Sequence, residues 1–281
     1  MAQVTSPIAL ERRPISMQLR RFFRTPKGLA ILTLVPLVVA AAVGSSVALV
    51  MPLVLASVAA AMVVDAPILR AREHEWTFPD GALLSGLFVA MILSPHEAWY
   101  IGAVTSVVAI ASKYLARVGK ANVFNPAALA LVATFYVFDT GQSWWGALAE
   151  LPPVALVLLF ATGIFITRRV NKSAAVLAFL GCYYLLFTIT AFVGNPARVS
   201  ELYRAPDLHA ALFFAFFMVS DPPTSPPKPR DQIVFGAITA VASYAVFELL
   251  GAAYFLLAGL LVANVWEAWR KWSRARARRG L

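Results

Sequence analysis

Residues 80–95, DGALLSGLFVAMILSP, form an apolar segment that begins with Asp80, ends at Pro95 and is too short to cross a bilayer. A helix that crosses the hydrocarbon core needs about 20 residues. Residues 207–222, DLHAALFFAFFMVSDP, share Asp, Met and Pro at the same positions. Lipid cannot satisfy the free backbone groups at the ends of short helices. The two segments therefore predict broken helices around a central site, or alternatively tilted or re-entrant helices without a ligand.

The rest of the chain predicts an all-α integral membrane protein. Of its 281 residues, 60% are hydrophobic and 14% are charged, whereas a soluble domain is nearer half apolar and a quarter charged. Apolar runs of suitable length predict about ten transmembrane helices. They lie near 28–43, 47–69, 80–93, 97–115, 125–138, 152–167, 173–192, 209–219, 232–250 and 252–269.

The basic residues predict the orientation of these helices. With a cytoplasmic N-terminus, 22 of the 24 Lys and Arg residues fall on the cytoplasmic side, and only Arg198 and Arg204 do not. This skew follows the positive-inside rule and argues against a nucleic-acid partner. We expect a multi-pass protein of the bacterial plasma (inner) membrane with cytoplasmic N- and C-termini. The seven tryptophans lie near span ends, so we expect them at the membrane interface.

Ten helices divide into two sets of five. Because five is an odd number, the second set would insert upside down. We predict a cytoplasmic basic N-terminus at 1–27, a first five-helix repeat at 28–138, a second at 152–269 and a cytoplasmic basic tail at 270–281. Asp80 would then lie on the inside and Asp207 on the outside.

Two polar motifs border the predicted centre. Asn125 before Pro126 is a strong helix start. It is either a structural cap or a helix N-terminus that faces an anionic or polar ligand group. The loop that follows the second short segment, residues 220–231 (SDPPTSPPKPRD), holds five prolines within eight residues, so its backbone is stiff. Its short polar side chains either cap the next helix or hold a ligand.

Two carboxylates are candidates for an ion pathway, Asp65 and Asp80. A carboxylate as deep in a span as Asp65 is costly, which favours a functional role. The alternative is interfacial pairing with Arg70 or Arg72. We identify no catalytic residue and no metal site, because the consecutive residues 73–75 (EHE) would point in different directions on a helix or strand.

Several motifs resemble the NqrB/RnfD family, the membrane subunits of the sodium-pumping NADH:quinone reductase and of the Rnf electron-transport complex. They are residues 124–129 (FNPAAL), 220–226 (SDPPTSP), Arg230 with Gly236, and 20–27 (RRFFRTPK). The resemblance covers roughly residues 20–270. It implies a ten-helix fold of two inverted five-helix repeats, similar in architecture to urea transporters. It also implies transmembrane electron transfer through flavin.

The covalent flavin of the family is not expected in this chain. Typical members carry FMN on a threonine of a Ser/Thr-Gly-Ala-Thr motif in the outside loop between spans five and six. Here that loop reads FDTGQSWWGALAEL (138–151), and the chain has no Gly-Ala-Thr. Thr140 is therefore not assigned a flavin, and we expect any flavin, FMN or riboflavin, to be non-covalent. The candidate residues for its site, or for structural elbows, are Asn125, Pro126, Asp221, Pro222, Thr224, Ser225 and Arg230.

The resemblance favours a membrane subunit of an NqrB/RnfD-like electron-transport complex. Such a subunit takes part in flavin-linked transmembrane electron transfer, with or without coupling to Na⁺ or H⁺ movement. It would be at most one subunit of a redox-driven ion-translocating oxidoreductase, with other electron-transport subunits or redox flavoproteins as partners. The alternative is a stand-alone small-solute or ion transporter or channel on the same fold without redox activity. A bound flavin would distinguish the two.

Overall fold

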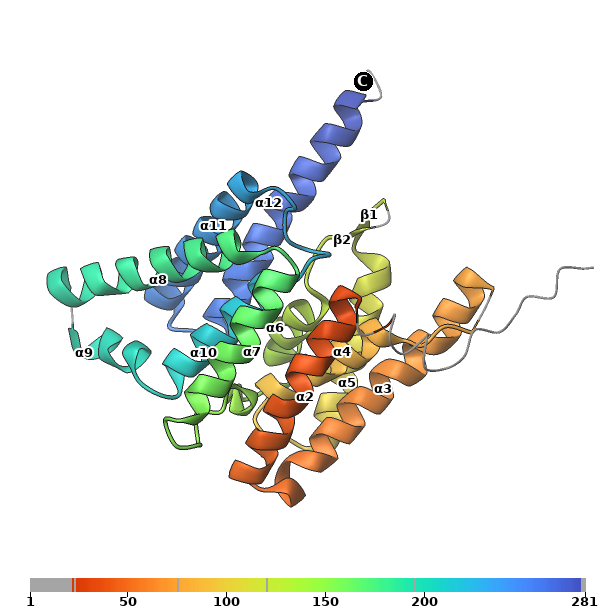
Figure 1. The fold of residues 1–281 in the computed structure, drawn as a ribbon, viewed down its shortest axis with the longest axis horizontal. Coiled ribbons are helices and arrows are strands. Elements are labelled where there is room, and N and C mark those ends of the chain that lie inside the picture. Colours follow the sequence, from red (N-terminus) through yellow and green to blue (C-terminus); the bar gives the residue numbers. More distant parts are fainter. Residues whose placement is uncertain (1–21, 23, 75, 120, 195, 279–281) are drawn as a thin grey trace, which may run out of the picture.

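The computed structural model describes residues 22, 24–74, 76–119, 121–194 and 196–278. Ten helices make up most of this part of the chain (Figure 1). They are α2 (Pro26–Gly44), α3 (Val47–Glu73), α4 (Asp80–Ile92), α5 (Trp99–Leu115), α6 (Pro126–Phe138), α7 (Ala155–Arg169), α8 (Ser173–Val193), α10 (Asp207–Phe213) with its π-helical continuation η3 (Phe214–Val219), α11 (Pro229–Leu250) and α12 (Phe255–Arg278). The remaining elements are short: β1 (Arg117–Val118), β2 (Ala121–Asn122), η1 (Trp145–Ala147), α9 (Pro196–Val199) and η2 (Ser200–Tyr203).

The helices have the lengths and surfaces of membrane spans. Among the described residues, α2, α3, α8 and α11 are long and apolar enough to cross a membrane, judged by length and composition. The helices α4, α5, α6 and α10–η3 are apolar but shorter. Large apolar side chains on the outer surface, such as Leu55, Leu177 and Phe192, are well exposed. The prediction of an all-helical membrane protein of about ten helices is confirmed.

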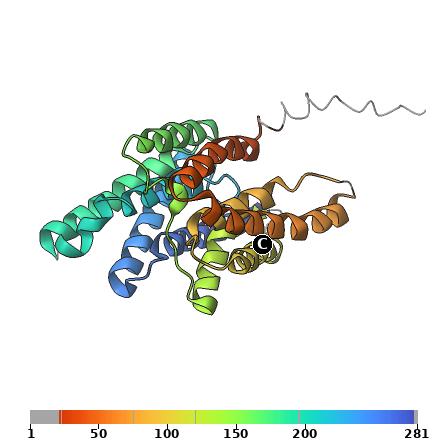
Figure 2. The ribbon, with the colours of Figure 1, turned by 90° about the horizontal axis from the view of Figure 1, so that it is seen from below.

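The two halves of the chain pair their helices in the same order. In the first half α2 packs on α4, α3 packs on α4 and α5, and α5 packs on α6. In the second half α7 packs on α10–η3, α8 packs on η3 and α11, and α11 packs on α12. Between the halves α2 contacts α7 and α6 contacts α12, so these four helices lie in the middle (Figures 1 and 2). This pairing supports the repeats that we propose at 28–138 and 152–269.

The two short segments run in opposite directions through the molecule. Lys27, at the start of α2, pairs with Asp80 at the start of α4. The other short helix reaches this same end with its last residues, because Asp221 follows η3 and lines a cavity together with Lys27. We call this end the basic face, defined by Lys27, Lys113, Arg117, Lys172 and Lys271.

The structure corrects several predicted boundaries. The eighth helix begins at Asp207 and not at 209, and α11 begins at Pro229 and not at 232. The last helix continues to Arg278, so most of the predicted basic tail, 270–281, is an extension of α12 that projects from the body (Figure 1). Residues 279–281 and most of the predicted N-terminal segment 1–27 lie outside the described residues. Local basic composition does not end a helix, because Arg is a good helix former.

The prediction of interfacial tryptophans is wrong for Trp144 and Trp145. Both rings are buried beneath α4. The indole N–H of Trp145 donates to the Ala90 carbonyl at 2.6 Å, and the Trp144 N–H donates to the Ile92 carbonyl at 3.2 Å. These residues satisfy carbonyl groups at the end of a short helix, which lipid could not do.

Close helix packing in both halves depends on glycine. A Cβ at Gly102 of α5 would lie 2.4 Å from the Ser57 hydroxyl of α3. A Cβ at Gly236 of α11 would lie 2.3 Å from the Ala175 carbonyl oxygen of α8. Small residues let helix backbones approach closely where no hydrophobic effect drives helices together in lipid.

We expect Gly236→Ala to lower the thermal unfolding midpoint of the detergent-solubilised protein. The added methyl group meets backbone atoms, and overpacking of this kind costs about 1–3 kcal/mol. Gly181→Ala is the matched control, because a Cβ at Gly181 of α8 meets nothing within 4 Å. Equal midpoints for the two variants would contradict the close approach of α8 and α11.

Candidate functional site

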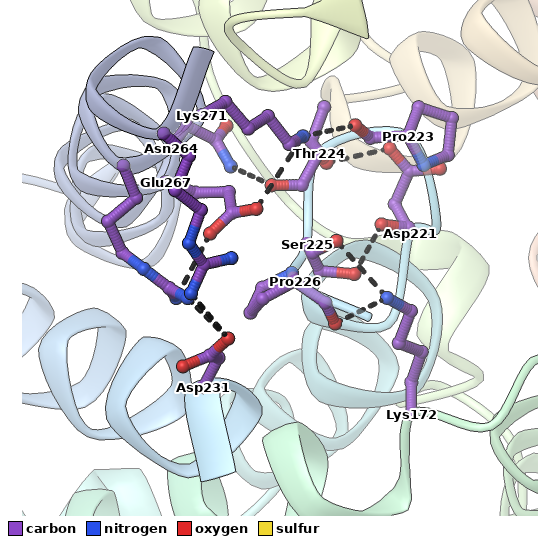
Figure 3. A network of polar contacts seen from close by, with 12 residues as sticks. Lys172, Asp221, Pro223, Thr224, Ser225, Pro226, Asp231, Asn264, Glu267 and Lys271 are labelled. Atoms are coloured by element: carbon purple, nitrogen blue, oxygen red, sulfur yellow. Dashed lines mark hydrogen bonds and ion pairs between the residues drawn. The ribbon is translucent and has the colours of Figure 1, made fainter. Parts of the chain in front are cut away.

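The proline-rich loop after η3 forms a rigid elbow at the basic face (Figure 3). The Thr224 hydroxyl donates to the Asp221 carboxylate at 2.8 Å, and the Ser225 hydroxyl donates to the Asp221 carbonyl at 2.6 Å. The buried Lys172 ammonium donates to the Ser225 and Pro226 carbonyls at 3.1 and 2.7 Å. Prolines remove donors and restrict backbone angles, so side chains from other elements hold this segment in place.

A buried asparagine joins the elbow to the start of α6. The Asn264 side chain of α12 accepts from the Asn125 N–H at 2.8 Å and donates to the Thr224 carbonyl at 3.4 Å. The Asn125 side chain in turn accepts from the Ala128 N–H at 3.1 Å and caps α6. The FNPAAL and SDPPTSP motifs, far apart in the sequence, are therefore joined through one side chain.

Ion pairs attach the start of α11 to α12 beside the elbow (Figure 3). Asp231 pairs with Arg270, and the Arg274 guanidinium lies 3.3 Å from the same carboxylate. Glu267 lies 3.2 Å from Arg270, and Lys271 donates to the Pro223 carbonyl at 3.2 Å. The elbow is thus supported from α8, α11 and α12.

The Asp221 carboxyl is half-buried and titrates near neutrality. Burial raises its pKa to about 6, against the opposing effects of the Thr224 hydroxyl and of Lys172. Burial likewise lowers the pKa of the Lys172 ammonium to about 8. Both groups lie in loops at the basic face, outside the helical spans.

Asp221 lines a cavity of about 520 Å³ between the two halves of the protein. Its walls come from the starts of α2 and α4, the end of α7, and the end of η3 with the elbow. Phe88 and Phe217 contribute aromatic wall, whereas Lys27 and Asp80 lie at the polar side. The volume falls within the usual range for small-molecule sites, about 300–1,000 Å³.

A second cavity of about 360 Å³ adjoins the first and shares Lys27, Phe88 and Asp221 with it. It is more polar, because Lys113, Arg117 and the starts of α4 and α6 line it. The pair of cavities combines apolar aromatic surface with a cationic rim. Ligand sites commonly combine apolar walls with a few polar groups in this way.

The structure brings most of the predicted site residues to these cavities. Asn125 and Pro126 line the second cavity, Pro222 and Asp80 line the first, and Asp221 lines both. The other predicted residues lie elsewhere: Thr224 and Ser225 are buried within the elbow, and Arg230 is exposed in the first turn of α11. Their assignment to a ligand site stays a prediction.

Asp65 lies behind the second cavity in a buried ion pair. The Lys113 ammonium is 2.9 Å from both of its carboxylate oxygens, and the Tyr114 hydroxyl donates to it at 2.6 Å. The expected pairing with Arg70 or Arg72 is therefore wrong. The side of α3 that carries Asp65 faces α5, which brings Lys113 and not the residues of its own last turn to the carboxylate.

Several residues that shape the site are not evident from the sequence, namely Lys27, Phe88, Lys113, Lys172 and Asn264. The lysines carry no local signal beyond their topological charge. A signal for Asn264 is present, since it is an isolated amide in the apolar run LLVANVW (260–266). Polar residues within spans usually hydrogen-bond to neighbouring helices.

Thr140 does not fit a covalent flavin. Its residue is 1% exposed, and its hydroxyl oxygen is buried without a hydrogen-bond partner among the described residues. A phosphodiester at this oxygen would require the packed loop to open. This geometry agrees with the expectation that Thr140 carries no flavin.

The fold and the cavities define a polytopic membrane protein with a binding site where short helices from two like-paired halves meet. Residues 24–151 and 146–268 match the NQR2, RnfD, RnfE family. The chain belongs to this family. A scaffold with a flavin-related site is expected from such membership, although the match itself does not identify a ligand.

Two relatives are each named as a component of an ion-translocating oxidoreductase complex, in both cases the RnfD-type subunit. The protein from Haemophilus influenzae is 33% identical over 111 residues, which cover 38% of this chain and 28% of that protein. The protein from Shewanella amazonensis is 24% identical over 281 residues, which cover 74% of this chain and 80% of that protein. The alignment with the first relative therefore spans little more than a quarter of its length.

We expect Asp221→Asn to change how stability depends on pH. The folded protein keeps the Asp221 proton to a higher pH than the unfolded chain, so wild-type stability falls as pH rises from about 4 to 6. The loss is on the order of 2 kcal/mol. The variant lacks this loss, so its thermal midpoint in detergent should gain on that of the wild type across this window.

Asp139→Asn is the matched control, because Asp139 is exposed after the end of α6, away from the elbow. Its midpoint should follow that of the wild type at every pH. Parallel curves for wild type and Asp221→Asn would show that burial does not perturb this carboxyl.

Proposed function

We propose that the protein is the membrane subunit of an NqrB/RnfD-like electron-transport complex and takes part in flavin-linked transmembrane electron transfer. The observation that carries this proposal is the convergence of the two family motifs on one pair of cavities. Asn125 and Asp221 come from opposite halves of the chain and line the same polar cavity. Membership of the NQR2, RnfD, RnfE family supports the same function.

The cavities suit a non-covalent flavin. Phe88 and Phe217 offer aromatic surface for a planar ring system. Asn125, Asp221 and Lys27 offer polar groups for its edge and side chain. A bound flavin would supply one- and two-electron transfer, which no protein side chain here provides. The residues of this chain would bind and orient it, and the packed elbow would limit its access to water.

The basic face is the proposed cytoplasmic side. Lys27, Lys113, Lys172 and Lys271 lie there, and the positive-inside rule places such residues in the cytoplasm. The proposed location is the bacterial inner membrane, with partners among electron-transport subunits or redox flavoproteins. The names of the relatives, which describe one member of a complex, support a role as one component of several.

A visible absorption spectrum of the detergent-purified protein tests this function. We expect a yellow chromophore that moves to the supernatant after acid precipitation, because the flavin would be held only by non-covalent contacts. Colour that stays with the pellet would contradict the assignment of a non-covalent flavin and would require another attachment site.

A colourless protein that also fails to quench added FMN and riboflavin would overturn the redox proposal. Uptake assays in liposomes would then test the transporter alternative. Asn125→Ala should reduce flavin content, whereas Asn125→Ser should retain it, since serine also caps a helix N-terminus.

A further inference from the structure

Two lysines from distant parts of the chain converge on one glycine in the second cavity. The Lys113 and Lys27 ammonium nitrogens would lie 3.4 and 3.5 Å from a Cβ placed at Gly81. Lys27 belongs to the first turn of α2, Gly81 to the first turn of α4, and Lys113 to the last turn of α5. Like charges repel, so a close approach of this kind favours an anion between them.

Each lysine is fixed by a carboxylate that leaves part of its ammonium group available. Lys27 donates to Asp80 at 2.7 Å. Lys113 donates to Asp65, which is fully buried and also accepts from Tyr114. An ammonium group has three donors, and each lysine also lines the second cavity. The carboxylates therefore position these cations without enclosing them.

Other groups around the cavity add positive potential. Arg117 lines it from β1, and guanidinium groups suit phosphate oxygens. The first turn of α6, beginning at Pro126, faces the cavity, and a helix N-terminus carries partial positive charge. Asp221 is the opposing charge in the shared wall. Lys172 and Lys271 lie close enough to this carboxylate to offset its charge.

We infer that Lys27, Lys113 and Arg117 form a phosphate-binding site in the second cavity, and that the flavin of the proposed function is FMN, not riboflavin. This inference rests on the proposed function. The two flavins share the ring system that would occupy the apolar cavity and differ in the terminal phosphate. The cationic cavity adjoins the apolar one, so a single ligand can occupy both.

Fluorescence-quenching titrations of the full-length purified protein with FMN and with riboflavin test this inference. We expect the wild type to bind FMN at least about tenfold more tightly, because charge-assisted hydrogen bonds to phosphate are strong. Raising the salt concentration should shrink the preference. Equal affinity for the two flavins would overturn the phosphate site and leave the proposed function intact. Failure to bind either flavin would overturn both.

Lys27→Gln and Gly81→Leu should bring the two affinities close together, mainly by weakening FMN. The first variant removes a charge from a partly exposed pair, so it does not leave a fully buried carboxylate unpaired. The second fills the space between the lysines without changing any charge, and leucine favours a helix more than glycine does. Lys228→Gln is the matched control, because Lys228 is exposed on the elbow and lines neither cavity.

A lipid headgroup offers the same phosphate chemistry, so one arm of the experiment adds short-chain phosphatidylglycerol and another adds phosphatidylcholine. FMN binding that is unaffected by either lipid supports FMN as the occupant. Loss of FMN binding with phosphatidylglycerol alone would show that the site takes an anionic lipid and would overturn the FMN assignment. An equal loss of FMN binding in Lys228→Gln would show that only overall charge matters and would overturn the site.

Discussion

The fold depends on satisfying the backbone polar groups at the ends of two helices that are too short to cross a bilayer. The helix α4 ends at Ile92, where its last carbonyls accept from Trp145 and from the backbone of residues 143–144. The helix α10–η3 ends at Val219, and side chains from α8 and α12 bond to carbonyls of the following elbow. Protein thus replaces water at both breaks, which explains why buried polar residues gather there.

The same requirement produces the binding cavities. A helix that stops short of the membrane surface leaves space that its neighbours must fill or line. At the basic face this space is lined by the starts of α2, α4 and α6 and by the elbow. Asn264 and Lys172 keep the elbow in one conformation, so Asp221 is held at the cavity wall. Stability and the proposed ligand binding therefore rely on the same contacts.

The repeated pairing of helices explains how two unlike halves support one site. The pairs α3–α5 and α8–α11 both close on a glycine, although the sequences around Gly102 and Gly236 differ. Packing constraints are retained between the halves. The polar residues that line the basic-face cavities are not, because inversion takes the start of α10, with Asp207, to the opposite side. The site is consequently asymmetric, with its cationic rim drawn mostly from the first half.

The sequence by itself determined the membrane class, the number of helices and the two motifs that border the centre. These features follow from apolar run length and from local capping at Asn125 and the prolines of 222–229. Only the tertiary structure decided that Lys27 and Lys113 meet at Gly81, that Asp65 pairs with α5, and that Trp145 is buried. Such contacts join residues that are far apart in the chain. They depend on how whole helices pack against one another, and no local pattern records that arrangement.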